Sequence, residues 1–509
     1  MDRTARRILA CGTFILFLSL PSPAALASKK DFPNVLLITI DTLRPDRLSC
    51  YGSSRLQTPN IDGVVRRGAL FSRAFSHNPI TLAAHVNILL GLTPPAHGVH
   101  DNSNFIVRDE FTTLAEWLRK AGYETAAIIG AFPLDSRFGL AQGFDLYDDN
   151  YGAQDPEAMS FVERRAEEVV DKAIGWLDGR TGPWFLWIHL FDPHQRYSPP
   201  EPFLSRFKDD PYSGEVAYVD QALGKLFSRI EAKGLGPKTL TIITGDHGES
   251  LGEHGETTHG YFAYNATLWV PLIIAVPGAK PLTVSSNVGH VDIFPTVCDL
   301  LGLEKPSPLH GRSLVPLLEG KKLPERDIYF EALTAYCNRG WAPLRGFISG
   351  SSKFMESPLP ELYDLEKDFE ETRNLAESQN VKPQRDRFNK LFAGLAIAGA
   401  EKARQKMDAE TREKLRSLGY LASPQTKVKT EFTAADDLKT LLPYHTKWMQ
   451  ATVAQQSGRL EEAMTLLREI IAERKDFDLA YTYLANYLKE AGRRAAAVEV
   501  LKEALEANP

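Results

Sequence analysis

Five continuous apolar runs constrain the fold of this chain more than any other feature of its sequence. Because their apolar residues are continuous rather than alternating, we expect strands that are buried on both faces. Helical patterns separate the runs, so the sequence predicts an α/β fold with a mostly parallel sheet. The runs are NVLLITI (34–40), ETAAIIGA (124–131), WFLWIHLF (184–191), LTIITG (240–245) and VPLIIAVPG (270–278).

The 509 residues, 43% of them apolar and 24% charged, are enough for two or more globular domains. We expect a signal peptide at 1–27, a catalytic domain at 31–378, a helical linker at 379–440 and a repeat module at 441–509.

The last of these segments contains a repeated pattern. A period of 34 residues in paired helices resembles the tetratricopeptide repeat, which implies a protein partner. A simple helical hairpin is the alternative. The matched pairs are Gly458 and Gly492, Ala451 and Ala485, Ala463 and Ala497, and Leu467 and Leu501.

The N-terminus has the features of a secretory signal. Three arginines precede a 13-residue apolar run, and Ala25 and Ala27 form an A-x-A pattern. We expect cleavage after Ala27 and a secreted or periplasmic protein. A membrane anchor is the alternative, but the run is shorter than the roughly 20 residues that span a bilayer.

Charge and cysteine content exclude some functions. The chain has a formal net charge of -6, and removal of residues 1–27, which carry a net +2, makes it -8. An acidic protein does not attract nucleic acid through its overall field, so we expect no nucleic-acid partner. The three cysteines that remain are too few and too scattered for a disulfide framework or a cysteine metal site.

Aspartates follow three of the apolar runs, at Asp41, Asp192 and Asp246. The carboxyl ends of parallel strands form the crevice in which α/β proteins bind ligands, so these carboxylates can converge. Like charges in one crevice repel, and a divalent cation usually resolves the repulsion. Within the glycine-rich stretch TGDHGESLGEHGETTHG (244–260), His247 adjoins Asp246 and can face the same ion.

Several distinct motifs follow one another from residue 34 to about 377. They are NVLLITIDTLRPDRLSCYG, NPITLAAHVNILLG, DPHQRYSPP, GDHGES, THGYFAYNATLWVPLIIAVPG, HVDIFPTVCDLLGL, HGRSLVPLL and ELYDLEKDFEETRNLA. Their order is that found in sulfatases, so this part of the sequence resembles the sulfatase family of the alkaline phosphatase superfamily. The resemblance implies an α/β/α sandwich, a bound divalent metal, a nucleophile at a helix start and hydrolysis of sulfate or phosphate esters.

The nucleophile motif departs from the family pattern. Sulfatases usually have C-x-P-S-R or S-x-P-S-R and convert the first residue to formylglycine, whereas this chain has TLAAH at 81–85. A threonine is not converted, so Thr81 should remain an alcohol. His85 stands where the family has arginine, and His259 where it has lysine.

The expected metal site departs from the pattern as well. The family offers two adjacent aspartates and an Asp-Asn pair, but this chain has Asp41-Thr42 and Asp246-His247. The set Asp41, Thr81, Asp246 and His247 resembles the single-metal site of phosphodiesterases and envelope phospho-group transferases in the superfamily. An imidazole in place of an amide favours zinc or manganese, with calcium or magnesium as alternatives.

The catalytic hypothesis assigns in-line attack to Thr81, activated by the cation. The other expected catalytic residues are His85, His194 and His259. The last two would hold ester oxygens or protonate the leaving group, a role that suits a pKa near neutrality. The missing formylglycine residue favours phosphate over sulfate esters.

Other interpretations stay open at this point. Thr81 can be a helix cap and nothing more. The acceptor can be water, as in a hydrolase, or an envelope molecule, as in a transferase, and a catalytically silent scaffold with partner-binding repeats is a third function. We interpret His189 as a strand histidine with a local partner, and Asn102 as a residue that could reach substrate.

Overall fold

The computed structural model describes residues 33–151, 163–417 and 429–507. The predicted signal peptide lies outside these ranges. Among the helices that the structure describes, none is both long enough and apolar enough to cross a bilayer.

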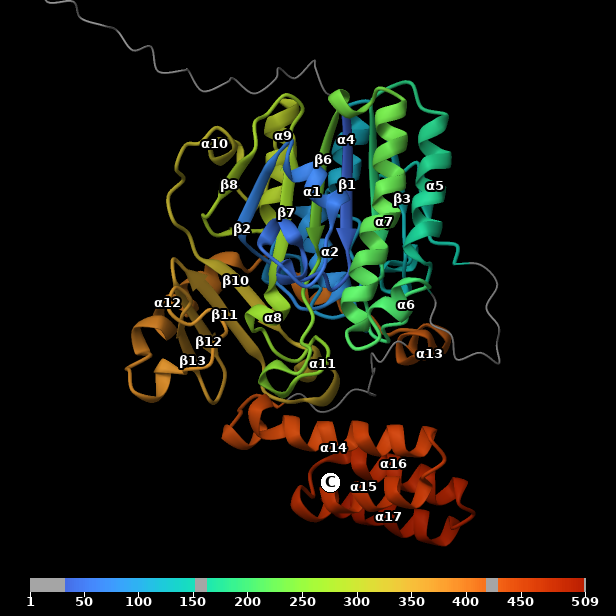
Figure 1. Cartoon of the computed structure of the whole chain (residues 1–509). Helices are drawn as coiled ribbons and strands as arrows, with labels where there is room; N and C mark the ends of the chain where they lie inside the picture. The colour runs from blue at the N-terminus through green and yellow to red at the C-terminus, as the bar shows by residue number, and fades with distance from the viewer. Residues whose placement is uncertain (1–32, 152–162, 418–428, 508–509) are drawn as a thin grey trace, which may run out of the picture.

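The core is one mixed, mostly parallel sheet, as predicted (Figure 1). Its strand order is β4-β3-β5-β1-β6-β7-β2-β8, and β9 pairs with β2. Of these strands, β7 is antiparallel to both of its neighbours, and the others run in the opposite direction to it. The strands are β1 (Asn34–Ile40), β2 (Ala69–Phe75), β3 (Glu124–Ile128), β4 (Leu146–Asp148), β5 (Trp184–Leu190), β6 (Thr239–Gly245), β7 (Trp269–Ala275), β8 (Leu282–Val284) and β9 (Val288–Gly289).

Helices cover both faces of this sheet. Successive side chains of a strand point to opposite faces, and in these strands both sets of side chains are apolar, so both faces must be buried. On β1, Leu36 and Ile38 pack with α1 (Pro59–Val65), α5 (Ala166–Asp178) and α7 (Pro211–Ala232). This buried packing confirms that the apolar run of β1 contributes to a core on that face.

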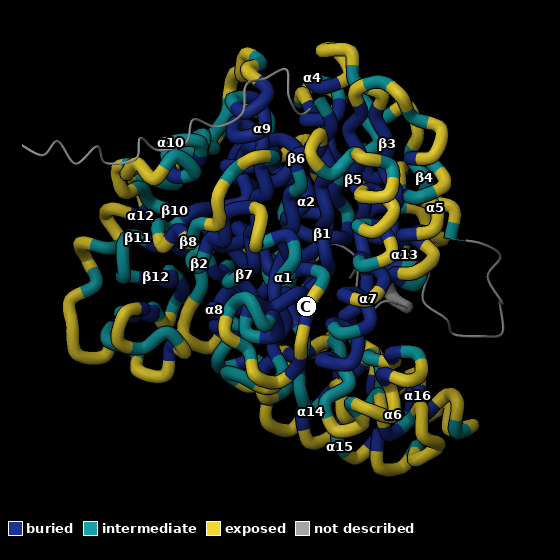
Figure 2. Tube along the Cα trace, turned by 45° about the horizontal axis from the view of Figure 1, so that its top comes forward, coloured by how far each residue is buried: buried dark blue, intermediate teal, exposed yellow. Residues whose placement is uncertain are grey.

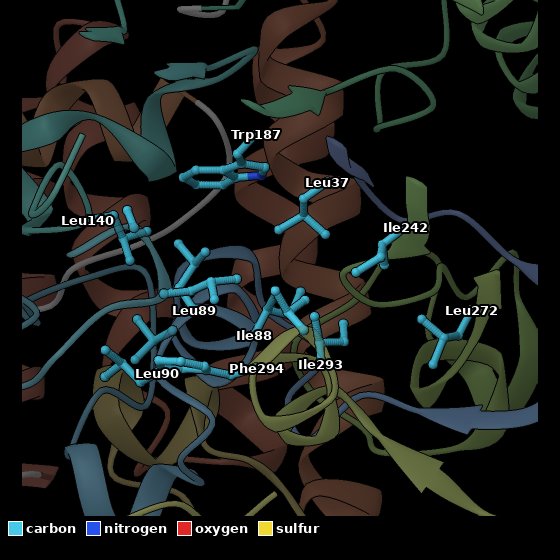
Figure 3. Packing of buried hydrophobic residues seen from close by; sticks show 14 of the residues in the cluster. Leu37, Ile88, Leu89, Leu90, Leu140, Trp187, Ile242, Leu272, Ile293 and Phe294 are labelled. Atoms are coloured by element: carbon cyan, nitrogen blue, oxygen red, sulfur yellow. The ribbon is translucent and has the colours of Figure 1, made fainter. Parts of the chain in front are cut away.

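Val35 and Leu37 of β1 face the opposite cluster. Figure 3 shows part of this cluster, in which Leu37 and Ile242 of the sheet meet Ile88 and Phe294. The helices on this face are α2 (Thr81–Leu90), α3 (Pro94–His97), α4 (Leu114–Lys120) and α9 (Ile293–Leu301). The middle of the sheet is therefore buried on both sides, as the dark strands of Figure 2 show.

A second, antiparallel sheet of order β10-β11-β12-β13 was not predicted from the sequence. One face of it packs on α12 (Lys382–Leu395), and the other contributes to a cluster with the C-terminal helices. Its strands are β10 (Ile328–Ala332), β11 (Leu344–Ser349), β12 (Ser352–Glu356) and β13 (Glu361–Asp364). Shorter helices connect the elements: α6 (Phe203–Arg206), α8 (Asn265–Leu268), α10 (Val315–Leu318), α11 (Thr334–Arg339) and α13 (Ala409–Ser417).

The C-terminal segment consists of α14 (Leu438–Gln456), α15 (Leu460–Glu473), α16 (Asp478–Glu490) and α17 (Arg494–Ala507). These helices stack beneath the catalytic core in Figure 1. Gly458 after α14 and Gly492 after α16 have the same φ of 75°. The helices exist as expected, whereas the tetratricopeptide interpretation stays a prediction.

Candidate active site

Thr81 is the first residue of α2 and is fully buried. The N-cap position belongs to Ile80, whose side chain makes no capping hydrogen bond, so Thr81 is not the N-cap that the sequence allowed. Asn102 Oδ1 instead accepts a hydrogen bond from the Leu82 amide at 2.7 Å. The Thr81 hydroxyl donates to Asp41 Oδ2 at 3.4 Å, so it is turned away from its own helix and toward the end of β1.

Asp41, Asp246 and His247 meet at the carboxyl ends of β1 and β6. Each offers a ligand atom within 4.8 Å of the others. His247 Nε2 lies 3.7 Å from Asp41 Oδ1 and 3.5 Å from Asp246 Oδ2. The parallel pairing of β1 with β6 brings these two strand ends together.

Backbone contacts fix the orientation of this group. Asp246 Oδ1 accepts hydrogen bonds from the Thr42 amide at 3.1 Å and the His247 amide at 2.7 Å. His247 Nδ1 lies 2.9 Å from the Gly248 carbonyl oxygen, which can only accept, so Nδ1 carries the proton. In a neutral ring, Nε2 then presents its lone pair to the carboxylates.

The electrostatics of the group are unfavourable without an added positive charge. Burial raises the pKa of Asp41 to about 8. Burial, and then the neighbouring Asp41, raise the pKa of Asp246 well above its usual value. Burial also lowers the pKa of His247 well below its usual value, so this ring does not supply the charge.

The donor atoms fit a divalent cation. Asp41 Oδ1, Asp246 Oδ2 and His247 Nε2 are buried and have no hydrogen-bond partner among the described residues. Donors bound at about 2.1 Å around one ion lie roughly 3 to 3.5 Å apart, close to the separations here. Two carboxylate oxygens and one imidazole nitrogen form a mixed oxygen and nitrogen donor set.

His85 is buried next to the group formed by Asp41, Asp246 and His247 and does not reach the protein surface. The ring is fully buried, and burial, followed by the nearby His189, lowers its pKa well below the usual value. His85 Nδ1 donates to the Thr81 carbonyl oxygen at 2.8 Å, and Nε2 lies 2.9 Å from Thr39 Oγ1. Both nitrogens thus contact protein groups, which suits a role in holding the first turn of α2.

His194 and His259 lie next to each other, and the His259 ring is close to that of His247. Their ring centroids are 5.1 Å apart, and the His259 ring is 4.5 Å from that of His247. Glu249 Oε1 lies 2.9 Å from His259 Nδ1.

The structure corrects the expectation that both rings keep a pKa near neutrality. Burial lowers the pKa of His194 well below its usual value. Burial also acts to lower the pKa of His259, but the Glu249 carboxylate outweighs it and raises this pKa to about 9. One ring is therefore neutral and the other cationic at pH 7.

The expected convergence of three strand-end aspartates holds for two of them. Asp192 Oδ2 accepts from the Ala166 amide at 2.9 Å, and its Oδ1 accepts from Arg165 Nη1 at 3.1 Å. The carboxylate therefore binds the start of α5, where it favours the positive end of the helix dipole.

Two residues near the group received no firm role from the sequence. Asn102 Nδ2 is buried without a hydrogen-bond partner among the described residues, although its Oδ1 binds the amide after Thr81. His189 Nε2 is likewise buried without such a partner and lies 3.5 Å from Asp41 Oδ2. The sequence signal for His189 was its position in the strand that pairs with β1.

Helix α14 covers the loop that carries His259. The Tyr261 ring lies 4.6 Å from that of His445 on α14, and Arg339 Nη2 donates to the Tyr261 hydroxyl at 2.9 Å. The Arg339 guanidinium also lies over the ring of Trp448, 5.1 Å from its centroid. The C-terminal helices and the active-site loop thus share one apolar cluster.

A sequence model of the sulfatase family matches residues 33–303, which is more than half of the chain. The chain belongs to the sulfatase family. A second model, for the C-terminal part of N-sulphoglucosamine sulphohydrolase, matches residues 252–396. The enzymes of this family are metal-dependent, and the chain is a sulfatase-family hydrolase that acts on ester bonds. Helices α14–α17 lie outside both matches.

Relatives and solved structures agree with this assignment. The choline-sulfatase of Rhizobium meliloti is 26% identical over 433 residues, which cover 68% of this chain and 83% of that protein. The arylsulfatase of Clostridium perfringens is 23% identical over 454 residues, 71% of this chain and 93% of that protein. The phosphonate monoester hydrolase of Agrobacterium radiobacter has a similar fold, with a TM-score of 0.61 and 24% identity over 71% of this chain and 95% of that one.

Proposed function

We propose that this sulfatase-family chain is a metal-dependent phosphoester hydrolase in which the Thr81 hydroxyl is the nucleophile. One observation carries the proposal: Thr81 Oγ1 leaves the capping of α2 to Asn102 and contacts Asp41 Oδ2. A threonine that served only as a cap would turn its oxygen toward the amides of its own helix.

Asp41, Thr81, Asp246 and His247 would hold the cation, with zinc or manganese preferred. When bound, this cation would lower the pKa of the Thr81 hydroxyl and neutralise a non-bridging ester oxygen. The unpaired buried atoms of Asp41, Asp246 and His247 support this assignment.

The side chains then divide the reaction between them. Thr81 Oγ gives its proton to Asp41 Oδ2, the oxygen it already contacts, and forms a bond to phosphorus. The bond from phosphorus to the leaving oxygen breaks, and that oxygen takes the electron pair. Asn102 Nδ2 and the positive end of the α2 helix dipole stabilise the charge on the non-bridging oxygens. His259, cationic beside Glu249, donates a proton to the leaving oxygen, and neutral His194 helps to position it.

Water then attacks phosphorus, the bond from phosphorus to Thr81 Oγ breaks, and Oγ takes a proton back from Asp41 to restore the hydroxyl. An envelope phospho-group transferase would instead pass the group to another acceptor, and products formed with and without glycan or lipid acceptors distinguish the two. The silent-scaffold alternative lacks a reason for gathering two unpaired carboxylates and a histidine in a buried group.

The remaining proposals concern the rest of the chain. We place the domains at 1–27, 31–378, 379–440 and 441–509, with a signal peptide and a secreted or periplasmic protein. The 34-residue period supports tetratricopeptide repeats that bind a protein partner. The acidic charge favours neither nucleic acid nor an anionic membrane surface.

The deciding experiment combines Thr81→Ala with a panel of aryl phosphate monoesters, phosphate diesters, phosphonates and sulfates. The wild type should turn over a phosphorus ester, and the variant should lose at least about 10³-fold in kcat/KM because no other hydroxyl replaces the nucleophile. Metal content should stay at the wild-type level in the variant. Thr81→Ser is the matched control and should keep part of the activity.

Retained turnover by Thr81→Ala would reject the nucleophile. Sulfate turnover without phosphorus-ester turnover in the wild type would reject the substrate class.

A further inference from the structure

The segment that carries Asn102 has little backbone support. Among the described residues, no amide from residue 99 to residue 105 donates to a backbone carbonyl oxygen. The backbone contacts of this segment begin at Asn104, whose carbonyl oxygen accepts from the Gln405 amide at 2.8 Å. The position of Asn102 therefore depends on side-chain contacts.

Asp101 makes the side-chain contacts nearest to Asn102. Its Oδ1 accepts from the Thr334 hydroxyl at 2.8 Å, and its Oδ2 accepts from Asn338 Nδ2 at 2.8 Å and from the Ser103 amide at 3.2 Å. The first two partners are four residues apart on α11 and so lie on one face of this helix. The third bond closes a turn around Asn102. This buried carboxylate thus ties the segment to α11 on both sides of Asn102.

Helix α11 begins beside the active site. A Cβ atom added at Gly260, the residue after His259, would lie 3.4 Å from Thr334 Oγ1 and 3.6 Å from Ile80 Cδ1. Ile80 directly precedes Thr81. The start of α11 therefore lies next to both the start of α2 and the loop of His259.

The Asn102 side chain needs a fixed position for the role proposed above. Its Oδ1 accepts from the Leu82 amide at 2.7 Å, and its Nδ2 is buried without a hydrogen-bond partner among the described residues. A donor stabilises a developing charge only if it is held in place before the reaction. A displacement of about 1 Å can cost about 10²-fold in rate.

We propose that Asp101 is a positioning residue of the active site, which holds the Asn102 side chain where it both binds the Leu82 amide and faces the non-bridging oxygens of the ester. The proposal rests on the proposed function, in which Asn102 Nδ2 stabilises the charge on these oxygens. Asp101 acts through Asn102 because α11 and the Ser103 amide occupy both of its own carboxylate oxygens.

A double-mutant cycle tests whether Asp101 acts through Asn102. The full-length wild type, Asp101→Ala, Asn102→Ala and the double variant are compared in kcat and KM on an ester that the wild type turns over. Asn102→Ala should lower kcat about 10²-fold, because a donor to the developing charge is lost. Asp101→Ala should lower kcat at least about 10-fold with a smaller change in KM, because the donor is then misplaced.

The double variant should be no slower than Asn102→Ala, because a side chain that is absent cannot be misplaced. A purely structural Asp101 would multiply the two losses, to at least about 10³-fold. Multiplied losses, or a wild-type kcat in Asp101→Ala, would overturn the proposal. A wild-type kcat in Asn102→Ala would also overturn it and would leave Thr81 as the nucleophile, whereas a wild type that turns over no ester would reject the proposed function.

Thr334→Val repeats the cycle if Asp101→Ala does not fold. It removes one of the three donors to Asp101, so it should lower kcat less than Asp101→Ala does and should have no effect in the Asn102→Ala background. A loss that persists undiminished in that background would contradict the proposal.

Two further variants separate the carboxylate from the segment around it. Asp101→Asn should keep most of the activity, because its amide can accept from Thr334 and, once the Asn338 amide turns over, donate to Asn338 Oδ1, which has no partner among the described residues. Ser103→Ala is the matched control on the other side of Asn102. It removes a hydroxyl without such a partner and keeps the amide that donates to Asp101, so kcat should not change. A loss in Ser103→Ala equal to that in Asp101→Ala would overturn the specific role of the carboxylate.

Discussion

The ends of β1 and β6 and the interior of the small sheet both bury charged groups, but the two clusters balance their charge differently. In the small sheet, Lys353 of β12 lies 2.6 Å from Glu371, and both side chains are almost completely buried. Lys353 Nζ also donates to Asn265 Oδ1 at 3.1 Å. The protein supplies its own cation there.

At the end of the main sheet, Asp41 and Asp246 have no lysine or arginine as a partner within the described residues. Burial keeps His247 and His85 neutral, and the cationic His259 offsets only part of the effect of burial, since the pKa values of both carboxyls stay raised. Burial alone therefore does not distinguish a structural cluster from a functional one. A buried cluster whose charge the protein does not balance with a lysine or arginine indicates a ligand-binding site.

The largest expected effect is that of Asp246→Asn. The amide oxygen can still accept from the Thr42 and His247 amides, so the loop should keep its shape. Metal binding should be lost, and activity should fall by about 10³-fold or more, which corresponds to roughly 4 kcal/mol.

The metal-free Asp246→Asn variant should be at least as stable as the metal-free wild type, because one of two repelling carboxylates is gone. Elemental analysis measures the metal content, kinetics measures the activity, and thermal unfolding after chelation measures the stability of the metal-free proteins. Wild-type metal content in this variant would remove the distinction between the two clusters.

Glu371→Gln should have the opposite pattern. Loss of one partner leaves Lys353 buried without its carboxylate, which costs about 3–5 kcal/mol of unfolding free energy. Metal content should not change, because the pair belongs to the small sheet. Urea unfolding measures the cost, and the double variant Lys353→Met/Glu371→Gln should recover part of it. A stability like that of the wild type would show that the pair is not a structural element.

Chelation should have a smaller effect than either substitution. Metal at about 100 times its dissociation constant stabilises the folded state by about 2.7 kcal/mol, so a chelator should lower the melting temperature of the wild type. Glu371→Gln should show the same decrease from its own starting point, and Asp246→Asn should show none. A melting temperature that changes with neither chelator nor added zinc would argue against a cation in the site.

Much of the main sheet could be predicted because β1, β3, β5, β6 and β7 are continuous apolar runs separated by helical patterns. The prediction also grouped Asp41 with Asp246, since parallel strands end at the same edge. Asp192 follows the same rule of position, but the free amides at the start of α5 attract its carboxylate. A capping contact of this kind depends on the position of the helix in the folded protein, which the local sequence pattern does not predict.

His189 was interpreted from its apolar run as a strand histidine with a local partner, and Thr39 is such a partner. Its contact with Asp41, at 3.5 Å, could not be predicted, because it depends on the register between β1 and β5. The small antiparallel sheet was missed because strands such as SKFME and ELYD are short and partly polar.

The contact between α14 and the loop of His259 has a consequence for biosynthesis. A chain is made from its N-terminus, so Tyr261 and Trp341 leave the ribosome before His445 exists to cover them. The nascent catalytic core therefore carries an uncovered aromatic surface until α14 has been synthesised and has folded against it.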